Sequence, residues 1–266
     1  MPELPEVETL KRELEQAIVG KKIAEVCVHA PRVIRETQPA KFKDLITGAA
    51  VQKVLRRAKV LILELSNGKS LVMHLKMTGQ LIYPGSGENS RVSFKFSDGS
   101  QLDFNDQRLF GELRLLDDWR DFVFIKGLGP EPQEITAQRF KTMLAAKKTK
   151  IKPLLLDQAF ISGVGNLYAA ESLFCAGIHP ERAANSLSDE EKEALLKCIN
   201  NVLNEAIKYH GSSVDNYVRL SGKQGSYVAH HRVYGREGKP CAVCKTPIKR
   251  IATGGRGTYF CPRCQH

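Results

Sequence analysis

The hydrophobic positions in the first twenty residues repeat at helical spacing. Four of them fall on one helical face: Val7, Leu10, Leu14 and Ile18. Pro5 has the fixed φ of a first helical turn, and the acidic residues around it complement the positive end of a helix dipole. The pattern predicts an amphipathic helix that begins within the first few residues and ends near position 20.

Residues 22–116 follow a different pattern, in which short apolar stretches alternate with polar positions and turn residues. The clearest stretches are KIAEVCVH, KVLILEL, KSLVMHL, RVSFKF and QLDF. SNG joins KVLILEL to KSLVMHL, and SDGS joins RVSFKF to QLDF. Both connections are hairpin signals. Repeated hairpins at this spacing predict an antiparallel sandwich or barrel.

The periodicity changes again after a stretch rich in Gly and Pro at 117–135, which we expect to connect two domains. Helices are predicted near 136–146, 165–176 and 189–209. Ser188 with Glu191 three residues later forms a capping box at the start of the last helix. Between the last two helices, GIHPERAANSL predicts a double turn.

The charge of the chain narrows the class of partner. The 266 residues include 40 Lys and Arg against 29 Asp and Glu, a formal charge of +11, and the pI is near 9.3. Such an excess favours a polyanionic partner such as nucleic acid. The first residues lack the basic region followed by an apolar region that marks a secretory signal. No apolar run approaches the roughly 20 residues that span a bilayer. We therefore expect a cytoplasmic protein without a membrane segment.

Four of the seven cysteines form two C-x-x-C pairs near the end of the chain. CAVC and CPRC are separated by sixteen residues, the spacing of a four-thiolate zinc ribbon or finger. The predicted ligands of one structural Zn²⁺ are Cys241, Cys244, Cys261 and Cys264. The alternative is two disulfides or four unrelated thiols. Because four thiolates fill a tetrahedral zinc, the metal should be structural and not catalytic.

The other three cysteines, Cys27, Cys175 and Cys198, stand alone in apolar periodic segments. We interpret them as buried free thiols in a reducing compartment.

Five separated motifs together resemble one family. They are PELPEVE, RRAK, HLKMTG, GVGNLYAAESLFCAGIHP and GRGTYFCPRCQ, and they follow one another in the family's order from Pro2 to Gln265. The sequence resembles the bacterial formamidopyrimidine-DNA glycosylases, base-excision repair enzymes that remove oxidised purines such as 8-oxoguanine. The resemblance implies an α+β protein with three parts: an N-terminal β-sandwich at 1–130, a helical helix-two-turns-helix domain at 131–234 and a zinc finger at 235–266.

The resemblance also implies an active site at the start of the chain. Once Met1 is removed, the exposed amine of Pro2 is the expected nucleophile. Glu3 is the expected acid/base catalyst, and Glu6 is expected to orient water or the amine. Lys59 in RRAK corresponds to a catalytic lysine of the family, and the alternative is that it is an ordinary surface lysine.

DNA contacts follow from the same comparison of motifs. Three residues match those that fill the space left by a flipped base: Met77, Arg108 and Phe110. Phosphate contacts are expected from Arg91, Lys152, Asn166 and Arg256. His74 is either a sheet histidine or a further phosphate contact, and we favour the latter. The segment LSGKQGSYVAHHRVYGR corresponds to a loop that closes over the flipped base. The expected partner is therefore double-stranded DNA with oxidised bases, bound by a monomer.

The chain departs from the family pattern at a few positions. Asn89 and Arg91 stand where a histidine pair is common, and Leu109 replaces an arginine that often follows Arg108. We expect these changes to alter affinity or context preference. Two alternatives remain: an endonuclease VIII-type enzyme for oxidised pyrimidines, against which Leu4 argues because glycine is usual there, and a non-catalytic zinc-ribbon DNA-binding protein.

Overall fold

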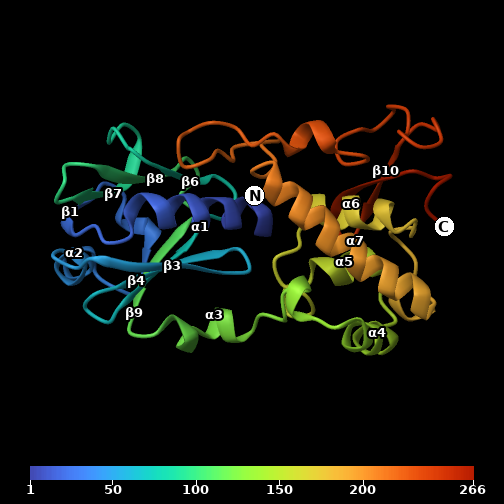
Figure 1. Ribbon diagram of the computed structural model, residues 1–266, viewed down its shortest axis with the longest axis horizontal. Helices are drawn as coiled ribbons and strands as arrows, with labels where there is room; N and C mark the ends of the chain where they lie inside the picture. The colour runs from blue at the N-terminus through green and yellow to red at the C-terminus, as the bar shows by residue number, and fades with distance from the viewer. The chain divides into compact units, whose positions relative to one another are not determined.

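The computed structural model describes residues 1–266, which form two compact units (Figure 1). The first, here called the sandwich unit, comprises Met1–Gly127 and Tyr209–Val228. The second, called the helical unit, comprises Leu128–Lys208 and Ala229–His266. The contacts therefore assign Tyr209–Val228 to the sandwich unit, whereas the family resemblance implied a helical domain that extends to residue 234. The three-part division by residue number stays a prediction.

The opening helix forms as the sequence predicted. α1 spans Leu4–Ile18, and its face of Val7, Leu10, Leu14 and Ile18 is at most 1% exposed in the core of the sandwich unit. Pro5 lies in the first helical turn, where its missing N–H costs no hydrogen bond. Burial of this face fixes the position of the helix start.

Two sheets pack face to face around that core (Figure 1). One has the order β1-β7-β8-β6, and the other has the order β2-β9-β5-β4-β3. The strands are β1 (Ile23–Val28), β2 (Ile34–Arg35), β3 (Val51–Arg57), β4 (Val60–Leu65), β5 (Ser70–His74), β6 (Gly79–Ile82), β7 (Ser90–Phe96), β8 (Gln101–Asp106) and β9 (Glu112–Leu116). All pairs are antiparallel except β2 with β9. The predicted sandwich is confirmed.

Both predicted hairpins form, between β4 and β5 and between β7 and β8. Each turn contains a glycine at positive φ, Gly68 at 81° and Gly99 at 84°.

The strand pattern did not predict α2 (Pro39–Ile46) or α3 (Val123–Lys126). α2 buries only Phe42 and Ile46, and so short a segment carries too few apolar positions to show a helical period.

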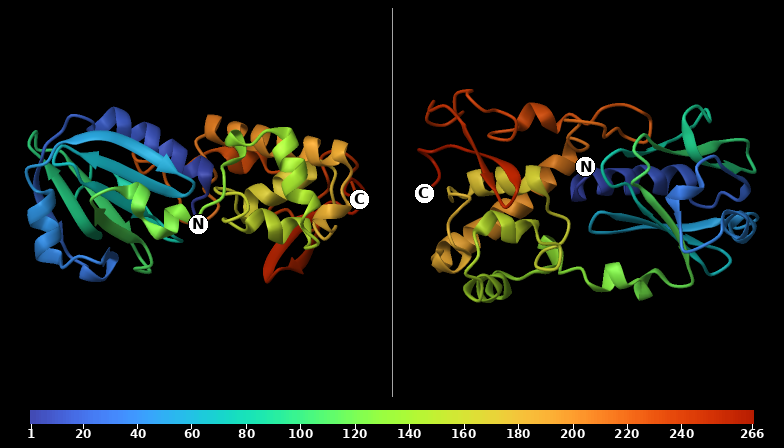
Figure 2. Two further views of the ribbon diagram at one scale, coloured as in Figure 1. Left: turned by 90° about the horizontal axis from the view of Figure 1, so that it is seen from below. Right: turned by 180° about the vertical axis from the view of Figure 1, so that it is seen from behind.

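The helical unit contains the three predicted helices and one more. α4 (Ala137–Ala145), α6 (Asn166–Cys175) and α7 (Asp189–Lys208) agree with prediction to within one or two residues. α5 (Ile151–Leu156) was missed because it has only six residues. The hairpin of β10 (Lys249–Thr253) and β11 (Arg256–Phe260), drawn in red in Figure 2, completes the unit and contacts α6. No helix has both the length and the apolar character that a membrane span requires.

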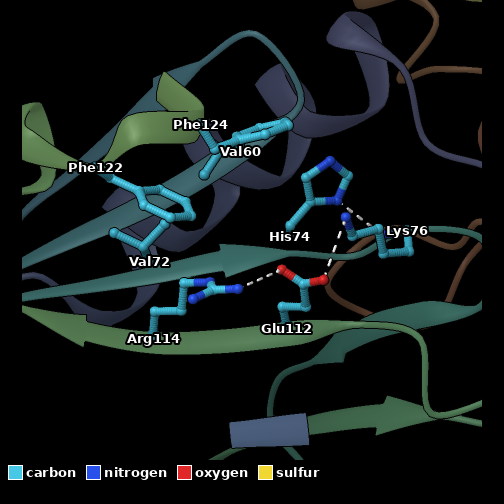
Figure 3. A pocket seen from close by; sticks show the side chains of 8 residues that line it. All are labelled: Val60, Val72, His74, Lys76, Glu112, Arg114, Phe122 and Phe124. Carbon is cyan, nitrogen blue, oxygen red and sulfur yellow. Dashed lines mark hydrogen bonds and ion pairs between the residues drawn. The ribbon is translucent and has the colours of Figure 1, made fainter. Parts of the chain in front are cut away.

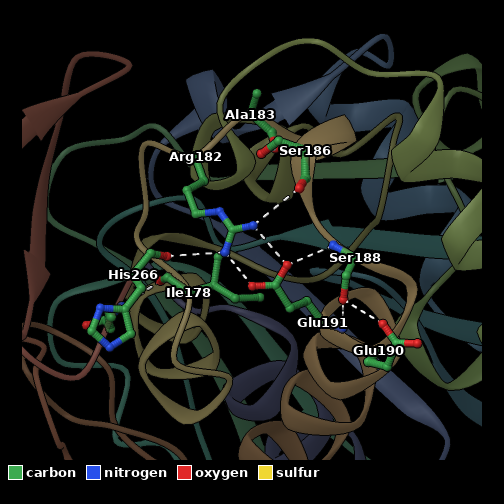
Figure 4. Close-up of polar contacts among 9 residues, drawn as sticks. Ile178, Arg182, Ala183, Ser186, Ser188, Glu190, Glu191 and His266 are labelled. Carbon is green, nitrogen blue, oxygen red and sulfur yellow. Dashed lines mark hydrogen bonds and ion pairs between the residues drawn. The ribbon is translucent and has the colours of Figure 1, made fainter.

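A polar network holds the double turn to the start of α7 (Figure 4). The predicted capping box is confirmed, because Ser188 N donates to Glu191 Oε2 at 2.7 Å and Glu191 N donates to Ser188 Oγ at 3.2 Å. Arg182, from the double turn, forms a bidentate pair with the same carboxylate and also donates to the carbonyl of His266 at 3.4 Å. Arg182 lowers the pKa of Glu191 by hydrogen bonding.

The cysteine interpretation needs one correction. Cys175, the last residue of α6, is bonded to Cys198 in α7, with their Cα atoms 5.7 Å apart. The two residues are therefore not free thiols. Sequence spacing could not indicate the pair, because packing of α6 against α7 brings the two sulfurs together. Cys27 is free as predicted, but it is half-buried at the sheet surface and not in the core.

Candidate active site

The start of α1 is an enclosed polar segment of the sandwich unit. Pro2 is buried, and Glu3 and Glu6 are only 6% and 3% exposed. Glu3 N donates to Glu6 Oε2 at 2.8 Å, and Ser212 N donates to Glu6 Oε1 at 2.8 Å. One carboxylate therefore joins the first helical turn to a segment that lies 206 residues away. The sequence pattern did not identify Ser212, because a backbone donor leaves no signal in side-chain chemistry.

The segment Tyr209–Val228 is tied to α1 at a second point. Glu13 accepts from Arg219 Nε at 2.7 Å and from Leu220 N at 2.9 Å. Gly211 has φ +78°, and a Cβ there would lie 2.9 Å from the Glu6 side chain, so the close approach requires glycine. α1 thus holds the base of the loop predicted to close over a flipped base, and the closure itself stays a prediction.

Lys59 lies in the tight turn between β3 and β4. Ala58 before it adopts a left-handed conformation with φ +51°. Arg56, at the end of β3, donates to Glu8 of α1 at 2.8 Å, which holds this turn beside the first turns of the helix. Lys59 is 7% exposed, so it is not an ordinary surface lysine. The structure therefore positions Glu3, Glu6 and Lys59 on elements that are directly tied together.

The three residues predicted to fill the space of a flipped base form one surface cluster. Met77 and Phe110 are 46% and 43% exposed, which is unusual for large apolar side chains. Arg108 lies between them, with Nη1 3.4 Å from the Met77 sulfur and the guanidinium 4.5 Å from the centre of the Phe110 ring. The structure thus brings together exposed residues from two separate loops of the sandwich unit.

A buried carboxylate that the sequence pattern did not single out shapes this cluster. Asp106 accepts from Arg108 N at 3.1 Å, from Gly111 N at 2.6 Å and from the hydroxyl of Thr78. These bonds fix the loops on both sides of the exposed residues. The three residues that depart from the family pattern belong to the same region. Arg91 Nε donates to the Asp106 carbonyl at 2.9 Å, and Asn89 is two residues before it and exposed. Leu109 follows Arg108 and packs against the sandwich core.

His74 lines a cavity of about 270 Å³ on the outer face of the β4-β5-β9 sheet (Figure 3). Phe122 and Phe124 cover one side, and an ion-pair chain of Lys76, Glu112 and Arg114 forms another. Burial lowers the pKa of His74 to about 3, with a smaller contribution from nearby Lys76. His74 Nδ1 accepts from Lys76 N at 3.0 Å, so the neutral ring carries its proton on Nε2. It is available as a hydrogen-bond donor, and the predicted phosphate contact stays a prediction.

In the helical unit, the predicted phosphate ligands lie around the N-terminus of α6. Asn166 is the first residue of the helix, and Arg256 begins β11. The side chain of Lys152 is fully buried, and its predicted phosphate contact stays a prediction. Its ammonium donates to Asn166 Oδ1 and to Thr258 Oγ1, both at 2.7 Å, and to Gly257 O at 3.2 Å. Lys152 thus holds the α6 start against the finger hairpin in this structure.

Glu171 of α6 has a structural role. Its carboxylate accepts three backbone N–H bonds from residues 232–234, at 2.8 to 3.0 Å. Burial raises the pKa of Glu171, although the three donors oppose that shift. The bonds anchor the chain that leads to the zinc finger.

The four paired cysteines meet at one point. All four sulfurs lie within 4.8 Å of one another, with Cys241 3.9 Å from Cys264 and Cys244 3.4 Å from Cys261. These separations suit four thiolates on one tetrahedral ion, whose metal–sulfur distance is about 2.3 Å. The set holds one structural Zn²⁺ and leaves no position for catalytic water.

A β-sandwich with an enclosed helix start, a helical unit and a four-cysteine finger defines a class of DNA-processing enzyme with a structural zinc. Family models match three stretches: the formamidopyrimidine-DNA glycosylase N-terminal domain at residues 1–113, the H2TH domain of the same enzyme at 127–218, and the zinc finger found in FPG and IleRS at 238–266.

Whole-length relatives agree with these models. The formamidopyrimidine-DNA glycosylases of Pelotomaculum thermopropionicum and Herpetosiphon aurantiacus are each 42% identical to this chain, over all of it and at least 99% of the relative. The Lactococcus lactis Fpg in complex with an abasic site containing DNA is 36% identical, with a TM-score of 0.92 over 99% of both chains. MutM (FPG) from Thermus thermophilus is 38% identical, with a TM-score of 0.89 over 99% of this chain and 98% of that one.

The chain belongs to the formamidopyrimidine-DNA glycosylase family. It is a DNA glycosylase and AP lyase of base excision repair with one structural zinc.

Proposed function

We propose that this enzyme excises oxidised purines, 8-oxoguanine and formamidopyrimidines, from duplex DNA through a covalent bond between Pro2 and the sugar. The names of the relatives support this substrate class, and the complex of a Lactococcus lactis FPG variant with a Fapy-dG containing DNA supports it further. We also propose that the enzyme acts as a monomer in the bacterial cytoplasm.

The observation that carries the proposal is the enclosed start of α1. After removal of Met1, the secondary amine of Pro2 adjoins Glu3, whose backbone is fixed by Glu6. An amino-terminal amine is a weaker base than a lysine side chain, so more of it is neutral and nucleophilic at pH 7. The positive end of the α1 dipole favours the neutral form further.

The reaction follows from this placement. The Pro2 nitrogen attacks C1′, and the glycosidic bond breaks as the departing base takes up a proton. The amine proton is then lost and the C1′–O4′ bond of the sugar opens as Glu3 moves a proton to O4′, which leaves the nitrogen joined to C1′ by a double bond. A secondary amine leaves an iminium that cannot become neutral by losing a nitrogen proton. Its positive charge draws electrons while the 3′ and then the 5′ phosphate leave by elimination. Lys59 supplies electrostatic or general-acid help near the damaged base, and Glu6 holds the amine in position.

DNA is held by the exposed cluster and the finger. Met77 and Phe110 replace the stacking lost when the damaged base leaves the duplex, and Arg108 binds the base left behind. Asn166, Arg91 and Arg256 bind phosphate, Lys152 positions Asn166, and His74 donates from Nε2 to phosphate.

Borohydride trapping tests the proposal. Protein lacking Met1 is mixed with a duplex that carries 8-oxoguanine opposite cytosine, and borohydride should reduce the iminium to a permanent protein–DNA bond. Pro2→Gly should weaken or abolish trapping, whereas Pro39→Gly, at the start of α2, should not. A parallel duplex with thymine glycol tests the endonuclease VIII-type alternative. If processed wild-type protein never crosslinks, or if active enzyme retains Met1, the nucleophile is not Pro2.

A further inference from the structure

The bond between Cys175 and Cys198 lies at the surface of the helical unit and not in its core. Cys175 ends α6 and is the only exposed residue of that helix, and Cys198 is half-buried in α7. Their Cα atoms are 5.7 Å apart, an ordinary separation for a disulfide. A small thiol or disulfide in solution can therefore reach this pair, which distinguishes it from a disulfide sealed in a core.

The two helices pack together without help from the bond. α6 contacts α7, and apolar residues close to the two cysteines in sequence are fully buried: Leu173 in α6, and Leu195 and Ile199 in α7. Burial of such side chains supplies most of the stability of packed helices. Breaking the bond should thus leave the fold intact, so the pair can change between dithiol and disulfide without unfolding the helical unit.

The residues that follow Cys175 support the end of the zinc finger. Residues 177–179 form three hydrogen bonds of 2.9 Å with residues 265–266, which come directly after the last zinc ligand, Cys264. Gln265 also accepts from the backbone N–H of Cys261, another ligand, at 2.8 Å. Movement at the end of α6 therefore reaches residues that are bonded to, or adjacent to, zinc-binding cysteines.

We propose that Cys175 and Cys198 form a reversible modification site that reacts with small disulfides of the glutathione type, and that the oxidised pair stabilises the zinc finger. The thiolate of Cys175 attacks the small disulfide, whose S–S bond breaks, and one small thiol leaves as a mixed disulfide forms. The thiolate of Cys198 then attacks the Cys175 sulfur and releases the second small thiol. Two protein thiols lose their protons and are oxidised, and the small disulfide takes up two electrons and two protons. Excess small thiol reverses both steps.

The position of the bond in the chain links its oxidation state to the finger. Cys175 and Cys198 are 23 residues apart in the sequence, and residues 177–179 lie in the segment between them. Closing that segment restricts how far it can open, so its bonds to residues 265–266 break less often. The inference rests on the proposed cytoplasmic location, where the small-thiol pool reduces an exposed disulfide unless small disulfides accumulate. The site thus stabilises the finger under oxidising conditions, which also oxidise purines in DNA.

Redox titration of the full-length enzyme tests whether the site is reversible. The enzyme is equilibrated in buffers with different ratios of reduced to oxidised glutathione, free thiols are blocked, and the linked peptides are identified by mass spectrometry. The link between Cys175 and Cys198 should be absent in a large excess of reduced glutathione and should become the main form as oxidised glutathione increases. A link that persists in every buffer would be a permanent structural bond, and a link that never forms would leave no site. Either result overturns the inference.

Zinc release to a chelator tests the effect on the finger. At the two ends of the titration, the oxidised form of the wild-type enzyme should release zinc about tenfold more slowly, with slower hydrogen exchange at residues 177–179. Cys175→Ser and Cys198→Ser should release zinc at the faster rate in both buffers, because neither variant can form the bond. Cys27→Ser, which changes a free thiol outside the pair, is the matched control and should retain the wild-type difference.

Two outcomes of the zinc measurement would overturn the inference. One is equal zinc release from both forms of the wild-type enzyme. The other is an unchanged difference in Cys175→Ser, which would mean that glutathione acts directly on the zinc-binding cysteines. None of these measurements uses DNA or the Pro2 amine, so failure of the inference is distinguishable from failure of the proposed chemistry.

Discussion

The start of α1 and the zinc finger are each held in place by a few groups. The groups that hold α1 lie far apart along the chain, whereas those that hold the finger lie close together. Glu6 accepts a bond from Ser212, 206 residues away, whereas the finger closes between two cysteine pairs within the last 26 residues. The first is held by buried hydrogen bonds inside a large core. The second has only a small apolar cluster, in which Ile248 lies with Val233 and Ala170 of α6, and it relies on metal ligation. Loss of a single group should therefore weaken α1 in part but disrupt the finger completely.

The largest effect is expected from removal of a zinc ligand. Cys261→Ser should release the metal and unfold the β10-β11 hairpin, because small metal sites draw most of their folding free energy from the ion. DNA affinity should fall by about two orders of magnitude, since the finger no longer presents its cations to phosphate, while unfolding of the sandwich unit is unchanged. Zinc content, fluorescence anisotropy with labelled duplex and thermal unfolding measure the three effects. Cys27→Ser, which changes a free thiol outside the finger, is the control, and wild-type DNA affinity of zinc-free protein would contradict the comparison.

Loss of the Glu6 carboxylate tests how the start of α1 is held. Glu6→Ala leaves the backbone N–H groups of Glu3 and Ser212 without their acceptor in a buried site, at a cost of about 2–4 kcal/mol in the free energy of unfolding. Urea denaturation measures this value. Glu15→Ala, on the exposed side of α1, removes only an ion pair with Lys11 and should cost less than about 0.5 kcal/mol. Equal costs for the two variants would show that Glu6 does not hold the helix start.

Lys152 tests how the finger hairpin is joined to α6. Lys152→Met keeps most of the side-chain volume but removes the donor shared by Asn166 and Thr258. We expect zinc to be retained and DNA affinity to fall about tenfold, since Asn166 and β11 lose their common partner. Lys197→Met, on the exposed face of α7, controls for loss of one positive charge. An equal loss of affinity in both variants would mean that Lys152 acts through charge alone.

The sequence could predict those parts of the molecule whose signals are local. Helical spacing identified α1, Gly-containing turns identified two hairpins, and Cys spacing alone identified the metal ligands. Motif resemblance added Lys59 and the cluster around Arg108, because the order of motifs carries information that composition does not. Their exact roles in catalysis and DNA binding stay predictions.

Contacts between distant segments could not be predicted. The bond from Ser212 to Glu6 uses a backbone donor, and Lys152 looks like any other basic residue until its burial is known. Cys175 and Cys198 were misinterpreted for the same reason, because only the packing of α6 on α7 brings them together. In each case the missing information was which residues lie next to each other in space, and a residue's own chemistry does not contain it.

The smallest expected effect is a change in the acid stability of the sandwich unit. Because the pKa of His74 is lowered to about 3 in the folded protein, the unfolded chain binds a proton at this residue below about pH 6.5 that the folded chain does not bind. Stability from neutral His74 is therefore present above about pH 6.5 and is lost as the pH falls toward 3.

His74→Gln removes this titration, so its free energy of unfolding should fall less steeply than that of wild type between about pH 6.5 and 4. At about pH 8 the variant should be slightly less stable, since the acceptor for Lys76 N is changed. Urea denaturation at a series of pH values measures both effects, and His29→Gln, at an exposed position, should follow the wild-type curve. If His74→Gln also follows it, the imidazole is not kept neutral by burial. Such a result would show that the outer face of this sheet is more open to water than the start of α1.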